Sequence, residues 1–428
     1  MKLPLPKLDA RLQARFEKVV KEHLSPAQIL AAGLRALPKA GKAFSSTQGL
    51  WRFLYNENVR LPSLGKPLLT CGQQWLTEQC DQWGLVPHDW SHVRYTTHTA
   101  KPDQLKIGKG TGYTLEAALL LSDRAGAPLS PLCLHWWTAQ GCYTTQATEP
   151  VPDLSYLDAV TATMEHLRAQ KWSLPLCHII DRAADSAAHL RAWDAAEETF
   201  LVRGDEGHKV EWEGRSQRLS VIADAVEVRA SQALEWDAGA VATLFVGETT
   251  VRLTRPAYQK TAQGRRVVPG APLTLRLIVC EVRLPDDTLA ARWCLLSNAP
   301  PSVSASTLVD WYYWRWRIES YFKLLKSAGW DLEQWQQETP LALLKRLCVV
   351  AMACVVVWFL QRDQTPQGAE VRTLLLRLSG RQVRRGHAPA PALLAGLCTL
   401  LSVLDVLEHY DLNDLKEIAR SISFVGSG

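Results

Sequence analysis

The stretch LPLCHIIDRAAD, residues 174–185, decides which fold the sequence predicts. Its apolar residues form a short run, which is typical of a strand buried on both faces of a sheet. The run ends at Asp181, and open α/β sheets place their functional groups at the carboxyl ends of such strands. We therefore expect a buried strand that delivers one carboxylate to a site.

The segments on either side of this strand predict a mixed α/β core. They are three strands of antiparallel character in GLVPHDWSHVRYTTHT (84–99), YTLEAALLLS (113–122) and PLCLHWWTAQ (131–140), helices over 156–170 and 185–195, and the strand TFLVRG (199–204). Residues 208 to 298 are again rich in strand signals, which indicates an inserted antiparallel sheet. Its loop KTAQGRRVVPGAP exposes Arg265 and Arg266 at a predicted tip.

Both ends of the chain read as helical, and a chain of 428 residues has room for two or three domains. We expect an N-terminal helical domain, a core in two parts that are separated by the insertion, and a C-terminal helical region. The predicted bounds are 1–80 for the first domain, 81–206 for the first part of the core, 207–298 for the insertion, 299–340 for the second part of the core and 341–428 for the last region.

Charge is unevenly distributed along the chain. Residues 1–60 hold 11 Lys and Arg against 4 Asp and Glu, while the formal net charge of the whole chain is +5. A basic arm on a nearly neutral body suggests a polyanionic partner, with nucleic acid as the first candidate. The alternative is a helical face whose charges only improve solubility.

The ten cysteines occur singly, without a CxxC pair, and several stand inside apolar runs. They are typical of reduced core residues in a cytoplasmic protein rather than of zinc ligands or disulfides. The N-terminus has no signal-peptide core, and the apolar run from Leu347 to Leu360 is shorter than a bilayer span. We expect a soluble protein without a membrane partner.

The segment DWYYWRWRIESYFKLLKSAGWDLEQW, residues 310–335, is exceptionally rich in aromatic residues. On a helix with about 100° per residue, Tyr312, Arg315, Glu319 and Lys326 share one stripe about 60° wide. The plain interpretation is a solvated face on which Arg315 pairs with Glu319 at i,i+4. The functional interpretation is a stripe that presents one carboxylate and two cations to a ligand.

Three carboxylates stand out by position: Asp89 in the first predicted strand, Asp181 at the end of the buried strand, and Glu319 on this helix. Two such acids on neighbouring strands and a third on a covering helix could hold two divalent metal ions about 3.5–4 Å apart. Magnesium prefers oxygen ligands, so it suits this set together with a phosphate. Arg315 and Lys326 could then hold DNA phosphates, and Tyr312 could donate to a phosphate oxygen.

The spacing Tyr312-x2-Arg315-x3-Glu319-x6-Lys326 resembles the Tyr-Arg-Glu-Lys signature of DDE transposases of the bacterial IS-four family. Further matches to the family occur in the same order as in its members. STQGLWRFLYNENV resembles an N-terminal module that binds transposon ends, HDWSH resembles the first-Asp strand, and IIDRAAD resembles the second-Asp motif. FLVRG resembles the strand that follows this motif, and WCLLSNAP resembles the segment before the Glu helix. The sequence departs from the pattern at Trp90, where a small hydroxyl residue is expected, and Asp103 is the fallback for the first acid.

The resemblance implies an RNase H-like catalytic core with the β insertion between its second Asp and its Glu, and a C-terminal region used in homodimerisation. It implies cut-and-paste transposition at terminal inverted repeats through a hairpin intermediate, with two Mg²⁺ ions per site, for which Mn²⁺ substitutes, and no nucleotide cofactor. The expected partners are the double-stranded inverted repeats and target DNA, in the bacterial cytoplasm with the nucleoid.

The remaining expected DNA contacts flank this site. Arg182 and Arg203 follow the two strands beside it, and Arg265 and Arg266 would grip end DNA. Trp293 is either a core residue or a platform that stacks on a base drawn out of the duplex. Two other functions stay open: a domesticated DNA-binding protein without catalysis, and an RNase H-like nuclease that only hydrolyses.

Overall fold

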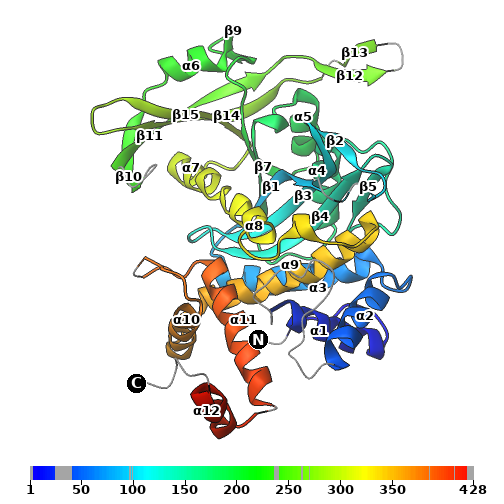
Figure 1. Cartoon of the computed structure of the whole chain (residues 1–428). Helices are drawn as coiled ribbons and strands as arrows, with labels where there is room; N and C mark the ends of the chain where they lie inside the picture. Colours follow the sequence, from blue (N-terminus) through cyan, green and yellow to red (C-terminus); the bar gives the residue numbers. More distant parts are fainter. Residues whose placement is uncertain are drawn as a thin grey trace.

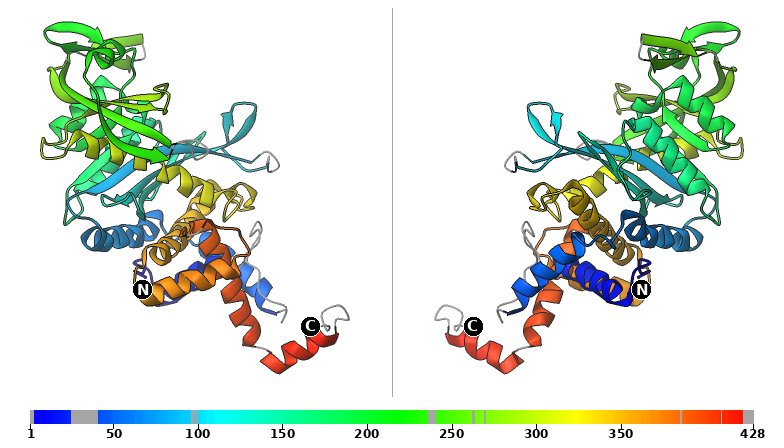
Figure 2. Two further views of the ribbon diagram at one scale, coloured as in Figure 1. Left: turned by 90° about the vertical axis from the view of Figure 1, so that its left-hand side faces the viewer. Right: turned by 90° about the vertical axis from the view of Figure 1, so that its right-hand side faces the viewer.

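The computed structural model describes residues 3–24, 41–95, 98, 100–235, 241–261, 264–268, 270–384, 386–408 and 410–421. Within these ranges, the side chains at 41–46, 234–235, 258–261, 264–266 and 405 are not described. Figure 1 shows a sheet in the middle of the molecule, long strands of the insertion at one end and a group of helices at the other. The two side views confirm this order along the long axis (Figure 2).

One large mixed sheet organises the described part of the chain. Its strands follow the order β5-β4-β3-β1-β6-β7-β15-β14-β11-β8-β9, while β2 pairs with β3, and β10 with β11. The bounds are β1 (Gly84–Arg94), β2 (Leu105–Ile107), β3 (Gly110–Ser122), β4 (Pro128–Thr138), β5 (Gly141–Thr144), β6 (Leu176–Ile180), β7 (Thr199–Arg203), β8 (Lys209–Trp212), β9 (Arg215–Arg218), β10 (Arg229–Glu235), β11 (Val241–Leu253), β14 (Leu273–Arg283) and β15 (Leu289–Ser297).

The centre of this sheet confirms the predicted α/β pattern. Strand β6 runs parallel to both β1 and β7, and β3 and β4 continue antiparallel on the other side of β1. Ile179 and Ile180 of β6 are fully buried, as the apolar run predicts. Helices α4 (Tyr156–Arg168) and α5 (Ala187–Ala195) stand before β6 and between β6 and β7. Such helical crossovers allow neighbouring strands to run parallel.

The strands of the insertion are antiparallel, as the sequence predicts, and they join the sheet of the core. Strand β15 pairs antiparallel with β7, with Leu295 opposite Arg203, so the insertion extends the sheet of the core. This pairing satisfies backbone groups that β7 would otherwise leave exposed at an edge. The hairpin β12 (Ala257–Thr261) and β13 (Gly264–Val268) forms a two-stranded sheet of its own and projects from one end of the molecule (Figure 1).

Helix α9 (Pro340–Arg362) is the core of the helical half. It begins at Thr339, whose side chain accepts a hydrogen bond from the N–H of Ala342. With 23 residues it is longer than the predicted run and long and apolar enough to cross a membrane, but 83% of its apolar window is buried inside the fold. Because the protein itself covers this helix, it is a core helix, and the interpretation of a buried element is confirmed.

Most of the other helices pack around α9 and the sheet. They are α1 (Ala10–Leu24), α2 (Gly41–Leu54), α3 (Leu61–Gln79), α6 (Leu219–Ala225), α7 (Ala305–Trp314), α8 (Arg317–Leu325), α10 (Pro366–Leu378) and α11 (Ala390–Leu407). The last helix, α12 (Leu412–Ser421), has no buried residue and lies beyond the end of α11 (Figure 1). Residues of α1, α2, α3 and α9 share one hydrophobic cluster with β1, β3 and β4. All ten cysteines are free and buried, as the sequence predicts.

Candidate active site

The parallel pairing of β1 and β6 brings two predicted carboxylates together. His88 of β1 lies opposite Ile180 of β6, so the next residue on each segment, Asp89 and Asp181, stands at the same level. Asp181 ends its strand and caps a short 3₁₀ turn by accepting a hydrogen bond from the N–H of Ala183 at 2.9 Å. The predicted placement of Asp181 at a strand end is therefore confirmed.

The helix that carries Glu319 is interrupted, although the sequence predicts one continuous helix. Helix α7 ends at Trp314 and α8 begins at Arg317. At the break, the N–H of Arg315 donates to the carbonyl of Tyr312 at 3.2 Å, an i→i−3 bond of the tighter 3₁₀ type. Because apolar residues continue on both sides of the break, hydrophobic periodicity gave no sign of it.

Arg315 lies between two of the carboxylates. Its Nη1 donates to Oδ2 of Asp89 at 2.8 Å, and its Nη2 lies 3.7 Å from Oε1 of Glu319. The predicted i,i+4 pair with Glu319 is present, but the shorter contact reaches across to β1. Arg315 is only 7% exposed, so this face of the helix is not simply solvated. The guanidinium instead joins the break between α7 and α8 to β1.

The electrostatics show that the three carboxylates act on one another. Burial raises the pKa of Asp89, Arg315 lowers it in part, and Asp181 adds to the increase. Burial also raises the pKa of Glu319, which Arg315 lowers in part and which Asp89 and Asp181 raise further. Crowded carboxylates of this kind are stabilised by a cation placed among them. In this structure, Arg315 supplies that positive charge.

The three carboxylates suit a divalent cation that prefers oxygen ligands by their chemistry, although not by their arrangement in this structure. Asp89, Asp181 and Glu319 supply carboxylate oxygens only, and their mutual repulsion favours the binding of such a cation. In the described ranges, no three side chains stand in a metal-binding arrangement, and Arg315 separates Asp89 from Glu319. Asp103, the fallback for the first acid, lies in a turn before β2 and not on β1.

Lys326 and Tyr312 are engaged within the fold. The Nζ of Lys326 donates to Oγ of Ser91 at 3.0 Å and to the backbone carbonyl of His92, so it ties the end of α8 to β1. Tyr312 is buried and packs against Trp293, with ring centroids 5.7 Å apart. The sequence therefore located both residues beside the site, but in this structure their contacts support α7 and α8.

Two tryptophans beside the site differ in exposure. Trp293 is 8% exposed and belongs to the hydrophobic core, which agrees with its interpretation as a core residue. Trp316 stands at the break between α7 and α8 and is 54% exposed, with the Arg315 guanidinium 5.9 Å from its ring centroid. Sequence reasoning missed Trp316, although it falls outside the apolar face of the predicted helix.

The remaining predicted DNA contacts are distributed over two regions. Arg182 is exposed in the 3₁₀ turn after Asp181, and Arg203 is partly buried at the end of β7. Both follow strands whose ends flank the carboxylates. Arg265 and Arg266 lie on β13, away from α8 (Figure 1), and their side chains are outside the described residues.

No protein-family model matches this chain. The arrangement itself brings three carboxylates, a buried arginine and an exposed tryptophan together beside β1 and the carboxyl end of β6, two central strands of the mixed sheet. Such a carboxylate set can hold metal ions that activate a water and stabilise a leaving oxygen in phosphoryl transfer. An exposed aromatic side chain such as Trp316 can stack on a nucleobase.

Proposed function

We propose that this chain is a DDE transposase that cuts and rejoins DNA at the inverted repeats of an insertion sequence. The observation that carries the proposal is that Asp89 on β1, Asp181 after β6 and Glu319 on α8 lie beside the same two central strands of the sheet. Glu319 belongs to the Tyr-Arg-Glu-Lys signature of the IS-four family, and Asp89 and Asp181 stand in the segments that resemble its first-Asp and second-Asp motifs. The proposed location is the bacterial cytoplasm, in association with the nucleoid.

The strand order supports an RNase H-like core. Strands β4, β3 and β1 form an antiparallel meander, and β6 and β7 follow on the far side of β1 in parallel orientation. An RNase H-like core has this order, with its acids on the first strand, after the fourth strand and on a later helix. Asp89, Asp181 and Glu319 occupy the corresponding places.

The three carboxylates would hold Mg²⁺, or Mn²⁺ in its place. When bound there, the ions would supply an activated water or 3′-hydroxyl and stabilise the leaving oxygen in each strand cleavage and transfer. Arg315 would keep Asp89 ionised and in place by its 2.8 Å hydrogen bond. Lys326 would keep α8, and with it Glu319, docked on β1. The proposal includes the hairpin intermediate that the family resemblance implies.

A cationic cleft beside α8 supports DNA as the partner. The cleft has a volume of 510 Å³, and its basic lining residues are Arg317 and Lys323 of α8, Arg362 of α9 and His387 of the connector between α10 and α11. Of the described residues that line it, none is a carboxylate. The backbone phosphates of DNA that extends from the site near Glu319 would therefore lie beside positively charged side chains of the same helix.

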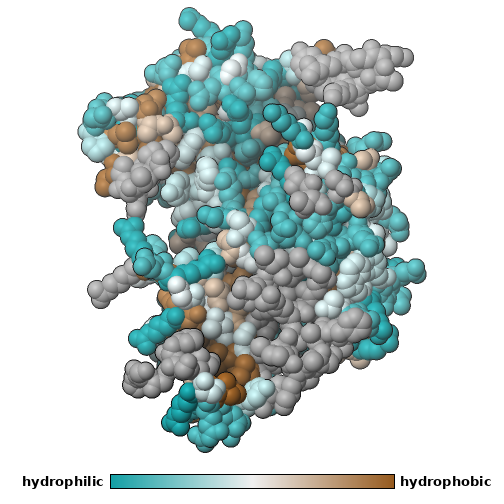
Figure 3. Space-filling model, in the orientation of Figure 1, coloured by the Kyte–Doolittle hydropathy of each residue, from teal (hydrophilic) through white to brown (hydrophobic). Residues whose placement is uncertain are grey.

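Exposed apolar side chains on the last helices support a homodimer. Val403, Leu404 and Leu407 of α11 and Leu412 and Ile418 of α12 are all exposed. Figure 3 shows hydrophobic side chains gathered over the region of α11. Contiguous apolar surface of this kind marks interaction sites. The proposed occupant is the second subunit of the complex that pairs two transposon ends.

The test is cleavage of labelled end DNA, whose sequence comes from inverted repeats that flank the coding region. With Mg²⁺, we expect the wild type to cut at the repeat boundary and to join the freed end to target DNA, while Glu319→Gln binds the ends without cutting. The matched control is Asp310→Asn on α7, which keeps its contact to Gln232 and should cut normally.

Three other outcomes would reject or narrow the proposal. Binding without cleavage by the wild type would favour a domesticated DNA-binding protein. Cleavage without joined products would favour a nuclease that only hydrolyses. Cleavage by Glu319→Gln at the wild-type rate would remove Glu319, and with it the carboxylate site, from the mechanism.

A further inference from the structure

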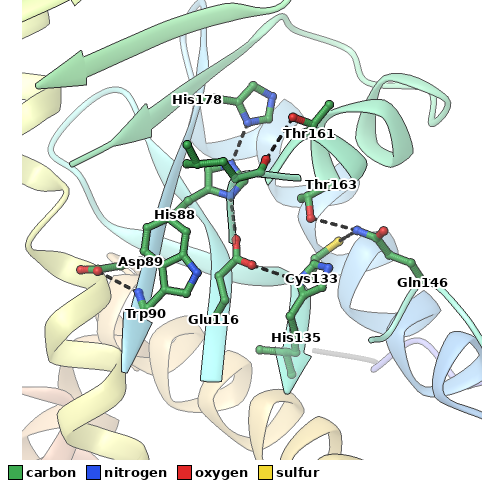
Figure 4. Close-up of polar contacts among 12 residues, drawn as sticks. His88, Asp89, Trp90, Glu116, Cys133, His135, Gln146, Thr161, Thr163 and His178 are labelled. Carbon is green, nitrogen blue, oxygen red and sulfur yellow. Dashed lines mark hydrogen bonds and ion pairs between the residues drawn. The ribbon is translucent and has the colours of Figure 1, made fainter. Parts of the chain in front are cut away.

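A chain of buried titratable side chains crosses the sheet directly behind the candidate site. Glu116 of β3 stands between two histidines, 3.4 Å from Nδ1 of His88 on β1 and 3.4 Å from Nδ1 of His135 on β4. Nε2 of His88 is hydrogen-bonded to Nδ1 of His178 on β6 at 3.0 Å. All four residues are at most 1% exposed. Figure 4 shows how they point toward one another across the strands.

This buried chain lies on the face of the sheet opposite to Asp89. Consecutive residues of a strand point to opposite faces, so His88 and Asp89 project in opposite directions. Trp90, on the same face as His88, packs against Tyr156 of α4, whereas Asp89 contacts Arg315 at the start of α8. In Figure 4, Asp89 points away from the histidines. The buried chain is therefore not part of the carboxylate site.

The two ends of the buried chain have different surroundings. Nε2 of His178 lies 3.8 Å from Oε2 of Glu198, whose other oxygen lies 3.0 Å from Nη1 of the half-exposed Arg168. Among the described residues, the ion-pair contacts of Glu116 are with histidines alone. An ionised carboxylate is stabilised beside an arginine and strongly disfavoured in a dry interior. Burial raises the pKa of both carboxylates, but Arg168 lowers that of Glu198 in part, so we assign the charge to Glu198.

This assignment determines the position of each proton. The charge of ionised Glu198, 3.8 Å from Nε2 of His178, favours the tautomer of neutral His178 that carries its proton on Nε2, so that Nδ1 of His178 accepts from Nε2–H of His88. The Nδ1 of neutral His88 then has a free lone pair, and only a protonated Glu116 can donate to it. In the reverse arrangement, the negative charge would lie on the fully buried Glu116, and Glu198 would be neutral beside Arg168.

Burial shifts the pKa values of these groups in the direction that this assignment requires. It raises the pKa of Glu116 well above its usual value, and the charge of Asp89 raises it further. It also lowers the pKa values of His88, His135 and His178. These directions agree with the proton positions that the geometry requires.

We propose that Glu116, His88 and His178 are positioning residues for the carboxylate site, and that Glu116 acts as a neutral acid that donates to His88. The His88–His178 hydrogen bond joins β1 to β6 immediately before the two strands deliver Asp89 and Asp181. It sets the lateral distance between the two carboxylates, and Glu116 selects the tautomer that makes this bond. The part that concerns cleavage rests on the proposed function.

The first test does not depend on any activity. In wild-type protein with ¹⁵N-labelled histidine, NMR at neutral pH reports which ring nitrogen carries the proton. We expect His88 and His178 both to be neutral and protonated at Nε2, with assignments from the His88→Gln and His178→Gln spectra. A proton on Nδ1 of His88 would mean that Glu116 is ionised, and it would overturn the proposal.

The second test compares substitutions of Glu116 in single-turnover cleavage of end DNA. Glutamine has an amide N–H that can donate to His88 in place of the acid, so Glu116→Gln should cut at close to the wild-type rate. Glu116→Met cannot donate, and we expect it to lose about 10²-fold in cleavage rate with unchanged DNA affinity, as a small misplacement of catalytic groups does. Ser130→Ala is the matched control, since it removes a buried hydrogen bond from the same sheet on β4.

The outcomes separate this proposal from the proposed function. If the wild type does not cleave, the proposed function fails, while the NMR result still decides the protonation of Glu116. If Glu116→Gln is as slow as Glu116→Met, a hydrogen-bond donor to His88 at this position does not sustain cleavage, and the proposal is wrong. Equal losses of cleavage rate in Glu116→Met and Ser130→Ala would mean that the buried chain only stabilises the fold in general, and this result would also overturn the proposal.

Discussion

Replacing Arg315 by methionine removes the cation that lies between Asp89 and Glu319. The contact to Asp89 is short and buried, whereas the side chain of Glu319 is 42% exposed and lies at 3.7 Å. Losing one partner of a buried pair costs about 3–5 kcal/mol, while a pair with an exposed carboxylate contributes about 0–1 kcal/mol. We therefore expect Arg315→Met to lower the free energy of unfolding at pH 7 by about 3 kcal/mol, almost all of it through Asp89.

The cost of Arg315→Met should depend on pH in a defined direction. Burial raises the pKa of Asp89 above the ordinary value of 3.8, and Arg315 counteracts part of that increase. Without Arg315, the pKa of folded Asp89 rises further, so the folded state binds this proton more tightly than the unfolded state. Stability is then lost as pH rises from the unfolded pKa through the folded one, and the cost should be small below about pH 4 and complete at neutral pH.

Urea denaturation of the wild type and Arg315→Met at pH 4 and pH 7 measures this difference. Adding Asp89→Asn to the variant should recover most of the loss at pH 7, because the unpaired charge is then gone. Arg317→Met is the matched control, since Arg317 is an exposed arginine on the same helix and should cost less than about 0.5 kcal/mol. An equal cost at both pH values, or no recovery in the double variant, would refute the reasoning.

Two further predictions concern DNA. Trp316→Ala should slow single-turnover cleavage but hardly change the free energy of unfolding, because Trp316 is exposed. Trp293→Ala should instead lower the melting temperature, because it removes a core side chain. The opposite pattern in cleavage and melting assays would contradict this assignment. The double variant Arg317→Gln, Lys323→Gln should reduce the slope of the logarithm of the DNA-binding constant against the logarithm of the salt concentration by about 1 per residue, as measured by gel shifts. Lys171→Gln, which changes an exposed lysine outside the cleft, is the control. An unchanged slope in the double variant, or an equal change in the control, would exclude the cleft as a binding surface for DNA phosphates.

The sequence was informative where each residue signals its environment locally. The apolar run before Asp181 predicted a buried strand, and helical spacing grouped Arg315 with Glu319; both inferences hold in the structure. The break at Arg315 could not be predicted in this way, because the aromatic residues around it suit either a continuous helix or two short ones. The pairing of β15 with β7 depends on which strand edge remains free, and local pattern does not reveal that.

The buried histidine chain was hidden from sequence reasoning for a different reason. His88, Glu116 and His178 are far apart in sequence, and each is a polar residue in a strand that also holds buried apolar residues. A polar residue in such a strand can equally lie at the edge of a core. Only the register between β3, β1 and β6 places these side chains on one face, and register follows from tertiary pairing.

That register also explains why two polar residues stand side by side in β1. A slip of β1 by one residue would exchange the faces of His88 and Asp89. Asp89 would then enter the dry layer beneath α4, and His88 would face Arg315, so both polar contacts would be lost at once. An apolar residue at 88 would tolerate that slip far better, because burial alone does not distinguish one apolar side chain from the next. The hydrogen bond from His88 to His178 therefore favours one register of β1. In that register, Asp89 faces α8 and stands beside Asp181.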